Sequence, residues 1–291
     1  MSIPHSALRT PHSFLMCRPT HYTIAYEINP WMSLKRQANR TRALAQWTRL
    51  HQLLTRQLGA RVRLLSPERG VPDLVFTANA GLINGRMLIR SNFRHPERQR
   101  EEPLIERYFR RHGFRVVRLS SRYDFEGEGD ALWVGRTLLF GFRFRSDAPA
   151  HEELARWLGA RVLPVELADR RFYHLDTCFC PLDDEAALWF PRAFDRYGRR
   201  VIERLVAEPI SVSERDATRF VCNAIPLPDP AGGCALVVHN GVSSSLRRRL
   251  ARRGVRIYPL DLSEFLKAGG SAKCLVLRLS RDRFPFPEAV R

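Results

Sequence analysis

Residues 59–65 have the sequence Gly-Ala-Arg-Val-Arg-Leu-Leu, a glycine followed by a short run that alternates basic and apolar side chains. Similar pieces occur at residues 113–119, 159–165 and 254–260, and the stretch 207–212 fills the one gap in the series. A spacing of roughly 50 residues between such pieces is typical of a protein built from repeated supersecondary units. The sequence therefore predicts about five copies of one unit.

Each unit is predicted to contain two strands, then a helix, then a third strand. The glycine follows an amphipathic helical stretch, where it can take the positive φ of a helix C-terminus. Turn signals such as Asn84-Gly85 separate the two strands that precede most helices. The predicted helices are residues 38–58, 103–111, 152–158, 196–206 and 244–253. The predicted strand pairs are 73–77 with 87–90, 131–134 with 137–142, 174–180 with 187–190, and 220–224 with 235–239.

The two ends of the sequence complete each other. The last strand pair is incomplete, because only residues 273–279 remain at the C-terminus. Residues 13–18 have a strand-like pattern and could supply the missing partner, which would close the units into a ring. No linker divides the chain, so we expect one domain over residues 1–291.

Composition limits the class of protein. The chain has 291 residues, of which 44% are hydrophobic, so it can bury a full core. No apolar run approaches the length of a membrane span, and the first ten residues lack a signal-peptide pattern. Six cysteines show no disulfide-framework spacing. These features favour a cytoplasmic protein with free thiols and no membrane contact.

The net charge of +18 raises the alternative of a nucleic-acid partner. Of the 48 basic residues, only Lys35, Lys267 and Lys273 are lysines, and the arginines are spread along the whole chain. The densest runs, 247–249 and 252–253, lie on one predicted helix, where a solvated face is the simpler interpretation. Nucleic acid is therefore an unlikely partner.

Four reactive side chains lie at three separate places in the sequence: Glu126, the pair His174 and Asp176, and Cys274. A thiol can act as nucleophile, an imidazole can transfer protons and carboxylates can hold a cationic substrate. Cys274 follows two glycines and the cation of Lys273, which could lower the pKa of the thiol. This set predicts thiolate chemistry on a cationic carbon.

Other polar residues could complete the site. Asp130 shares a glycine-rich loop with Glu126, and Arg98 and Arg145 could each grip a carboxylate with two N–H groups. His174, Asp176, Cys178 and Cys180 alternate along a predicted strand and would share one face. One straight strand cannot wrap a tetrahedral zinc ion, so we expect no metal there.

Taken together, these residues resemble the guanidino-group-modifying enzyme superfamily, which includes arginine deiminases, dimethylargininases, amidinotransferases and arginine dihydrolases. The resemblance covers most of the chain and rests on motifs in the family's order. They are 16–19 with 28–32 near the N-terminus, the first substrate loop 72–81 with Asp73, the Glu126 loop, His174-Leu175-Asp176, and the Gly-Gly segment before Cys274. It implies the pentein fold, a five-bladed α/β propeller of ββαβ pseudo-repeats, in agreement with the repeat above.

The resemblance also implies roles. Cys274 would form a covalent thiouronium, with His174 as proton donor and then base. Glu126 and Asp176 would bind the guanidinium, and Arg145 with Arg98 would hold the α-carboxylate. The acidic loop is one residue longer than the commoner Glu-Gly-Gly-Asp, so Glu128 remains an alternative to Glu126. No cofactor is implied.

Asn79 distinguishes among the activities that the resemblance allows. Deiminases and dimethylargininases usually carry Asp at this place, whereas Thr77-Ala78-Asn79-Ala80 is similar to the dihydrolases. An amide can both donate to and accept from a neutral ureido group, which would permit a second hydrolysis. We expect arginine to give ornithine, CO2 and two ammonia. The alternatives are a deiminase or dimethylargininase that gives citrulline, an amidinotransferase, and a non-catalytic binding propeller.

Overall fold

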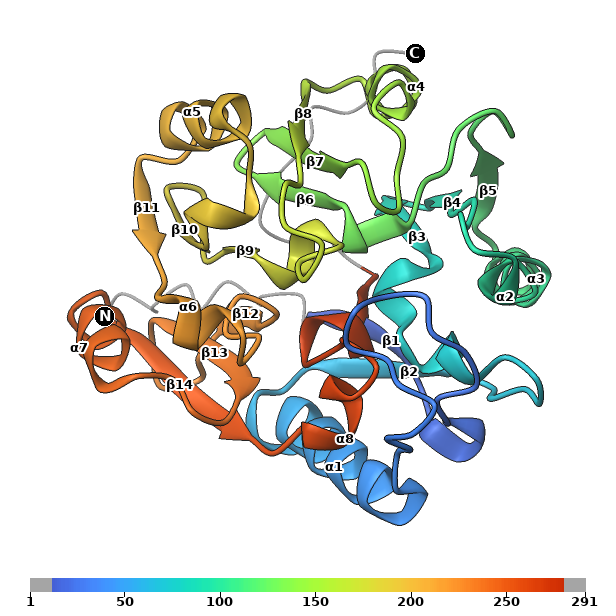
Figure 1. Ribbon diagram of the computed structural model, residues 1–291, viewed down its shortest axis with the longest axis horizontal. Helices are drawn as coiled ribbons and strands as arrows, with labels where there is room; N and C mark the ends of the chain where they lie inside the picture. The colour runs from blue at the N-terminus through green and yellow to red at the C-terminus, as the bar shows by residue number, and fades with distance from the viewer. Residues whose placement is uncertain (1–11, 280–291) are drawn as a thin grey trace, which may run out of the picture.

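Five three-stranded sheets surround a common centre in the computed structural model, which describes residues 12–279 (Figure 1). In every sheet the middle strand pairs antiparallel with one neighbour and parallel with the other. A helix connects each parallel pair, as a parallel connection requires. The predicted ββαβ repeat is confirmed, and the chain forms a five-bladed α/β propeller.

The strands and the helices that cross between them have the following bounds. The sheets contain β15 (Leu277–Arg278), β1 (Ser13–Cys17) and β2 (Arg61–Leu65); β3 (Gly81–Asn84), β4 (Met87–Arg90) and β5 (Arg115–Arg118); β6 (Ala131–Val134), β7 (Thr137–Phe142) and β8 (Val162–Glu166); β9 (Phe179–Pro181), β10 (Ala186–Trp189) and β11 (Glu208–Ser211); β12 (Ile225–Pro228), β13 (Cys234–His239) and β14 (Val255–Leu260). The crossover helices are α1 (Arg40–Gln52), α3 (Glu102–Arg111), α4 (Ala150–Leu158), α5 (Arg196–Leu205) and α7 (Ser244–Arg252). Three short helices are α2 (Pro96–Gln99), α6 (Glu214–Ala217) and α8 (Ser263–Leu266).

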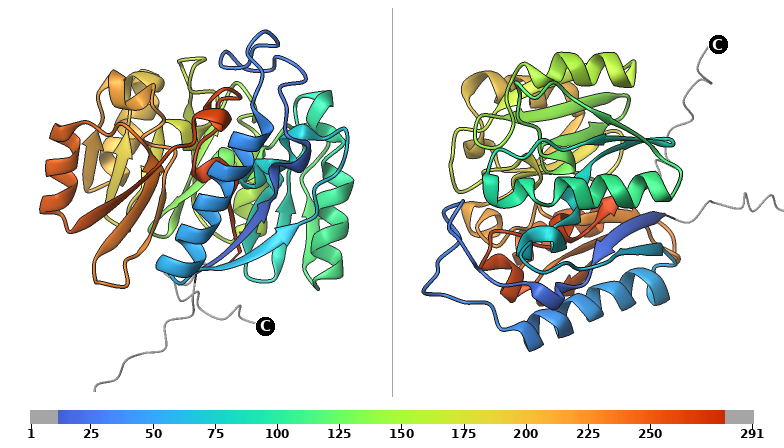
Figure 2. Two further views of the ribbon diagram at one scale, coloured as in Figure 1. Left: turned by 90° about the horizontal axis from the view of Figure 1, so that it is seen from below. Right: turned by 90° about the vertical axis from the view of Figure 1, so that its right-hand side faces the viewer.

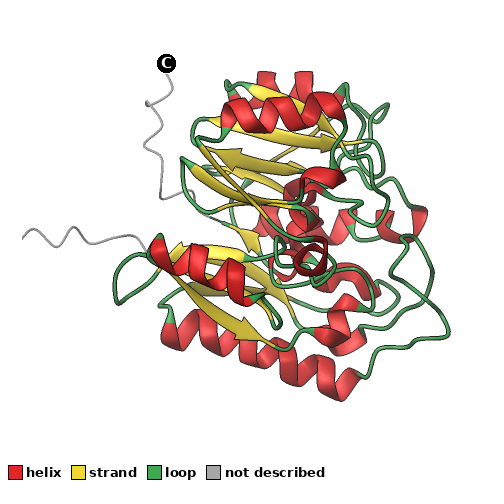
Figure 3. Cartoon of the chain, turned by 60° about the vertical axis from the view of Figure 1, so that its left-hand side comes forward, coloured by secondary structure: helices red, strands yellow, loops and turns green. Residues whose placement is uncertain are grey.

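The crossover helices lie on the outside of the ring, with the strands nearer its centre (Figures 1 and 3). Each helix buries a narrow apolar stripe, for example Leu50 of α1 and Leu250 of α7, and exposes its arginines. Side chains of Asn39, Asp195 and Ser243 accept hydrogen bonds from backbone N–H groups in the first turns of α1, α5 and α7. The dense arginine run therefore lies on α7, a surface helix.

The middle strands are buried on both faces. All four residues of β10 are buried, as are five of the six residues of β13. Such strands appear in the sequence as continuous apolar runs without alternation, because helices and neighbouring blades cover both faces. These strands form the rigid frame from which the turns at the ring centre project.

The ring is closed by the two ends of the described chain. β1 pairs antiparallel with β15, with Leu15 opposite Leu277, and parallel with β2. The predicted pairing of residues 13–18 with the C-terminal segment is thus confirmed at 277–278, whereas residues 273–275 of the predicted strand form a 3₁₀ turn. Because β15 begins three residues after Cys274, closing the ring also fixes the position of Cys274.

Glycine at the helix ends behaves as expected. Gly59, Gly113, Gly159 and Gly254 all have positive φ, between 57° and 74°. No helix within residues 12–279 is long and apolar enough to cross a membrane. The first ten residues, used above for the expectation about a signal peptide, lie outside the described part of the chain.

Three predicted strands are wrong. Residues 73–77 fall across the 3₁₀ segments η3 (Pro72–Val75) and η4 (Thr77–Ala80), and residues 220–224 form a turn. Of residues 174–180, Leu175–Thr177 are 3₁₀ and only 179 and 180 lie in a strand, β9. The four side chains from His174 to Cys180 therefore do not share one strand face. These segments are apolar because they are buried at the ring centre, and burial alone gives a strand-like sequence without strand geometry.

A long connection covers one end of the ring. The segment between β1 and α1, blue in Figure 2, projects beside α8 at that end. The Tyr22 hydroxyl donates to the Glu264 carbonyl at 2.9 Å, and Asn29 Nδ2 donates to the Ala268 carbonyl at 3.1 Å. This segment forms the roof over the turns described next.

Candidate active site

Five turns, one before the first strand of each blade, meet at the ring centre and are joined by hydrogen bonds. They are η4 (Thr77–Ala80), η5 (Gly127–Gly129), η6 (Leu175–Thr177), residues 220–224, and η8 (Lys273–Leu275). Their links form a closed cycle. Asn79 donates to the Glu126 carbonyl, Leu175 N to Asp130, Asn223 to the Asp176 carbonyl, Lys273 N to the Asn223 carbonyl, and Thr77 to the Leu275 carbonyl.

Each turn carries a polar or thiol side chain one to three residues before its strand. These residues are Asn79, Asp130, Asp176, Asn223 and Cys274. The repeat thus brings five equivalent positions together, although they are far apart in the sequence. Four of them, Asn79, Asp130, Asp176 and Cys274, belong to the predicted site. Cys274 contacts Asp176 and lines one cavity with Asn79.

Cys274 is buried, with 2% of its surface exposed. Its thiol donates to Asp176 Oδ2 at a sulfur–oxygen distance of 3.4 Å, and its sulfur accepts from Asn223 Nδ2 at 3.1 Å. Burial, and then the neighbouring carboxylate of Asp176, raises the pKa of the thiol well above its usual value. The free protein therefore holds Cys274 as a neutral thiol.

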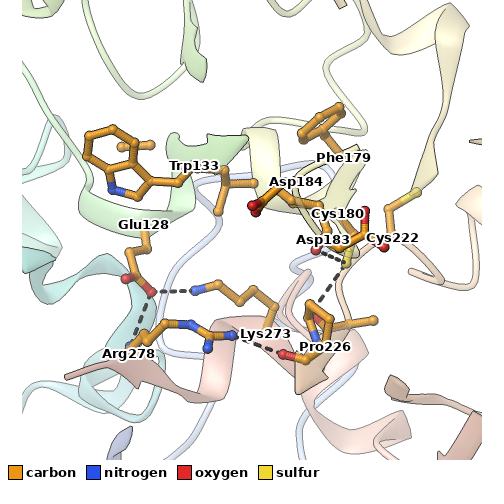
Figure 4. Close-up of a pocket in the computed structure, with 14 residues that line it drawn as sticks. Glu128, Trp133, Phe179, Cys180, Asp183, Asp184, Cys222, Pro226, Lys273 and Arg278 are labelled. Atoms are coloured by element: carbon orange, nitrogen blue, oxygen red, sulfur yellow. Dashed lines mark hydrogen bonds and ion pairs between the residues drawn. The ribbon is translucent and has the colours of Figure 1, made fainter. Parts of the chain in front are cut away.

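Lys273 does not serve as the predicted cation beside the sulfur. Its ammonium donates to Glu128 Oε2 at 2.8 Å and to the Val276 carbonyl at 3.4 Å. Figure 4 shows Lys273 and Glu128 together in a pocket of about 120 Å³ between β6, β9 and β15, to whose lining Cys274 does not contribute. Glu128 points into this pocket, where its carboxylate also accepts a hydrogen bond from Arg278 N.

Glu126 instead contacts the imidazole. His174 Nε2 lies 2.9 Å from Glu126 Oε2, which also accepts from Arg145 Nη1 at 3.0 Å. Burial opposes ionisation of Glu126, but Arg145 and His174 outweigh it and hold the pKa of this carboxyl well below its usual range. Of the two acids in the loop, the geometry favours Glu126 as the partner of His174.

His174 is neutral despite its acidic neighbour. Burial lowers the pKa of the imidazole to about 4, against the opposing effect of Glu126. Nδ1 of the ring has no protein partner within the described residues. A neutral imidazole with one free nitrogen can take up or release a proton at neutral pH.

Asp130 is buried but turned away from the cavity. Its Oδ2 accepts from the Ser146 hydroxyl at 2.7 Å, and its Oδ1 accepts from the Leu175 backbone N–H at 3.1 Å. The residue therefore anchors the turn that carries His174 and Asp176. Asp130 is not among the residues that line the cavity, and its Oδ2 lies 3.9 Å from His174 Nε2.

Asp73, Asn79, Arg98 and Arg145 line a small cavity together with Cys274. Arg98 forms a two-point ion pair with Glu101 and also donates to Asn79 Oδ1 at 2.9 Å and to the Asp73 carbonyl. Arg145 lies over the Tyr173 ring, 4.7 Å from its centre, and donates to the Ile28 carbonyl. The roof segment thus contacts the site through Arg145.

Buried polar atoms without a protein partner gather around this cavity. Among the described residues they include Asp176 Oδ1 and Ser271 Oγ, on the two segments that contact Cys274, and His174 Nδ1, at the start of the turn that carries Asp176. The Tyr26 hydroxyl and the Asp73 carboxyl are close enough to form a hydrogen bond with each other. An unpaired buried polar atom costs roughly 1–3 kcal/mol, so such a group marks a place for a polar ligand. The cavity holds about 10 Å³, enough for one water molecule, so a larger ligand requires the roof to shift.

No group of three or more His, Cys, Asp or Glu side chains within residues 12–279 is placed to hold a metal ion. Cys178 donates to the backbone carbonyls of His174 and Leu175, and Cys180 to that of Ala224. Their thiols are packed in the core.

Asn223 is a contact of the thiol that sequence reasoning missed. A signal was present, since Asn223 lies two residues before β12, just as Asn79 lies two residues before β3. Aligning the repeats by their first strands would have found it. The incorrect strand prediction for residues 220–224 hid this equivalence.

Comparison with known proteins gives the following similarities. The sequence model of a family described as N,N-dimethylarginine dimethylhydrolase, eukaryotic, matches residues 11–281. The bifunctional arginine dihydrolase/ornithine cyclodeaminase ArgZ of Synechocystis is 45% identical over 276 residues, which are 93% of this chain and 38% of ArgZ. The dimethylarginine dimethylaminohydrolase of Mycobacterium tuberculosis is 38% identical over 94% of this chain and 88% of its own length.

A solved structure also resembles the chain. The N-terminal domain of ArgZ, in a cysteine-to-serine mutant bound to substrate, superposes with a TM-score of 0.87 and 44% identity, covering 92% of this chain and 98% of that one. The chain spans 38% of the length of the whole ArgZ protein.

Proposed function

Because the chain belongs to the dimethylarginine dimethylhydrolase family of guanidino-group-modifying enzymes, we propose that it hydrolyses the guanidino group of free arginine twice. The products are ornithine, CO2 and two ammonia, and two water molecules are consumed. The observation that carries the proposal is the closed cavity in which Cys274 contacts Asp176 beside unpartnered polar atoms and two arginines. The substrate-bound ArgZ domain, an arginine dihydrolase, has the same fold.

The positive charge of the substrate promotes ionisation of the Cys274 thiol. A guanidinium beside Asp176 and Cys274 favours both the carboxylate and the thiolate, so binding assists the thiol in losing its proton. The thiolate then attacks the guanidino carbon. His174 takes the proton that the thiol loses and passes it to the departing nitrogen, so ammonia leaves and a covalent thiouronium remains. His174 removes a proton from water, which displaces the sulfur and gives citrulline.

Asn79 supports a second cycle. Its Oδ1 accepts from Arg98 and its Nδ2 donates to the Glu126 carbonyl, so one lone pair and one N–H of the amide remain for a ligand. These can pair with the neutral ureido group of citrulline. A second attack by Cys274 releases the second ammonia, and hydrolysis of the resulting thiocarbamate gives the carbamate of ornithine, which loses CO2.

Arg145 is the better placed clamp for the α-carboxylate. Of its five N–H groups, the contacts with Glu126 and Ile28 use two, so three remain. Arg98 uses four in its contacts with Glu101, Asn79 and Asp73. Arg98 therefore chiefly holds Asn79 and the Asp73 backbone in place. Arg145 binds the α-carboxylate of the substrate, in the cavity that Asp73 also lines.

A single hydrolysis that ends at citrulline is the second candidate. It is favoured by the description of the family and by the Mycobacterium tuberculosis relative, which is named for dimethylarginine. Such an enzyme releases citrulline with one ammonia from arginine, or with one dimethylamine from N,N-dimethylarginine. The two candidates share Cys274 chemistry and differ only in whether citrulline is released or cleaved again.

Product analysis decides between them. The purified protein is incubated with L-arginine, and ornithine, citrulline and ammonia are quantified together by mass spectrometry and an ammonia assay. The proposal predicts ornithine with two ammonia for each arginine consumed. Stoichiometric citrulline without ornithine would make the chain a deiminase, and turnover of methylarginine alone would make it a dimethylargininase.

Asn79→Asp is the matched variant in this assay. The carboxylate still accepts from Arg98 but has no N–H for the ureido oxygen. We expect arginine consumption within about tenfold of the original and ornithine formation reduced by roughly a hundredfold, so that citrulline accumulates. Cys274→Ser serves as the control without turnover.

A further inference from the structure

The side-chain amide of Asn223 joins its own turn to the two segments that surround the Cys274 thiol, the turn that contains Asp176 and residues 271–274. Its Nδ2 donates to the Cys274 sulfur at 3.1 Å and to the Asp176 carbonyl at 3.1 Å. Its Oδ1 accepts from the backbone N–H groups of Ser271 at 3.1 Å and Cys274 at 3.2 Å. All four hydrogen-bonding positions of the side chain are therefore occupied.

These contacts fix which end of the amide faces the sulfur. A flipped amide would direct its NH2 group at two backbone N–H groups and its oxygen at a carbonyl, which would break four hydrogen bonds at once. Asn223 is completely buried, so water could not replace them. The N–H donor toward Cys274 is thus set by the network.

The backbone around Asn223 supports the same arrangement. Its carbonyl accepts from Lys273 N at 3.2 Å, and its own N–H donates to the Phe220 carbonyl at 3.0 Å. Phe220 has a φ of 57°, which is costly for a residue with a side chain. This left-handed residue directs the turn toward the ring centre.

We propose that Asn223 is a positioning residue for the nucleophile, whose Nδ2–H holds the Cys274 sulfur and stabilises the thiolate while its Oδ1 holds the backbone of the nucleophile turn. The inference rests on the proposed role of Cys274. The Lys273 ammonium donates to Glu128 and not to the sulfur, so the donor that the sulfur receives is the neutral N–H of Asn223. Hydrogen bonds to a charged acceptor are about twice as strong as those between neutral groups, so this bond favours the ionised sulfur.

Alkylation of Cys274 in the absence of substrate tests the proposal. Wild type and Asn223→Asp are treated with iodoacetamide over a pH series, and peptide mapping measures the rate at Cys274 separately from the other five cysteines. The aspartate keeps the shape and the accepting oxygen but removes both N–H donors and adds a negative charge beside the sulfur. We expect the rate of Cys274 alkylation at each pH to fall by about tenfold or more, and kcat/KM for arginine to fall by roughly a hundredfold.

Asn92→Asp is the matched control. Asn92 also donates through Nδ2 to backbone carbonyls, those of Leu119, Ser120 and Tyr123, but it has no contact with Cys274. We expect this variant to lose stability and keep the wild-type alkylation profile. Asn223→Ser, which leaves room for a water molecule beside the backbone N–H groups and adds no charge, is measured in parallel and separates loss of the amide donor from the effect of the added charge.

The result that would overturn the proposal is an unchanged rate of Cys274 alkylation in folded Asn223→Ser, whether or not turnover is lost. Loss of turnover alone would then reflect a structural role. Because the alkylation needs no substrate, this failure is distinct from failure of the arginine dihydrolase proposal, which is read from products.

Discussion

At Asp176 the cost of burial exceeds the benefit of nearby positive charge. Burial raises the pKa of this carboxyl to about 7, and Lys273, the Cys274 thiol and Asn223 only partly offset it. Between pH 4 and pH 7 the folded protein holds a proton on Asp176 that the unfolded chain has released. The folded state is therefore destabilised as pH rises through this window.

Asp176→Asn removes that titration. The free energy of unfolding of the variant, measured by urea denaturation and compared with wild type at each pH, is expected to increase from pH 4 to pH 7 by roughly 2–4 kcal/mol in total. Above pH 7 the difference stays constant. A difference that is flat with pH would show that Asp176 is ionised in the folded protein throughout.

For single residues, the sequence identified which side chains belong to the site better than it identified the contacts that they make. Motifs selected seven residues that the structure places around one centre: Cys274, His174, Glu126, Asp176, Asn79, Arg98 and Arg145. Asp130 was selected as a ligand contact, but its two oxygens hold Ser146 and Leu175. Which way a buried carboxylate points depends on long-range partners that a local motif does not contain.

At the scale of elements, the turns before the strands are as important as the strands. The helices, the hairpins and the glycines at helix ends follow from periodicity and turn signals, and most were predicted. The 3₁₀ turns at the ring centre were predicted as strands, because short buried apolar runs look alike in either conformation. Their geometry is set by the hydrogen bonds between blades.

Two glycines with similar backbones test that statement. Gly159, at the end of α4, and Gly127, in η5, have φ of 57° and 60°. A Cβ at Gly159 meets nothing within 4 Å, whereas at Gly127 it would lie 2.7 Å from Gly81 N and 2.9 Å from the Ala78 carbonyl oxygen.

We expect Gly159→Ala to cost about 1 kcal/mol of unfolding free energy and to leave turnover unchanged. Gly127→Ala should cost at least twice as much and abolish turnover, because the backbone of η4 must move away from η5. Denaturation curves and arginine consumption measure both. Equal losses of stability would mean that the contact between these turns is not tight.

At the scale of the whole molecule, closing the ring is what assembles the site. The five linked turns come from all five blades, and β15, which carries Cys274 on its preceding turn, is held by β1. The repeat and the complementary ends allowed the ring to be predicted from the sequence. The net charge did not contribute to that prediction, since the arginines of α7 lie on the surface.

A closed ring should unfold as one unit. Leu277→Ala removes a fully buried side chain from the closing strand and is expected to cost roughly 2–5 kcal/mol. Tryptophan fluorescence and circular dichroism should still report a single coincident transition in both proteins. Leu44→Ala, at a side chain with 42% exposure on α1, is the control with little effect. Separate transitions by the two probes would divide the chain into independent units.

The central claim is that Cys274 attacks the guanidino carbon of the substrate. Acid quenching of the protein during turnover of L-arginine, followed by peptide mass spectrometry, measures this directly. The account predicts that the peptide containing Cys274 gains the mass of arginine less one ammonia, and that Cys274→Ser gains nothing. An adduct on another residue, or arginine turnover by Cys274→Ser near the wild-type rate, would contradict it.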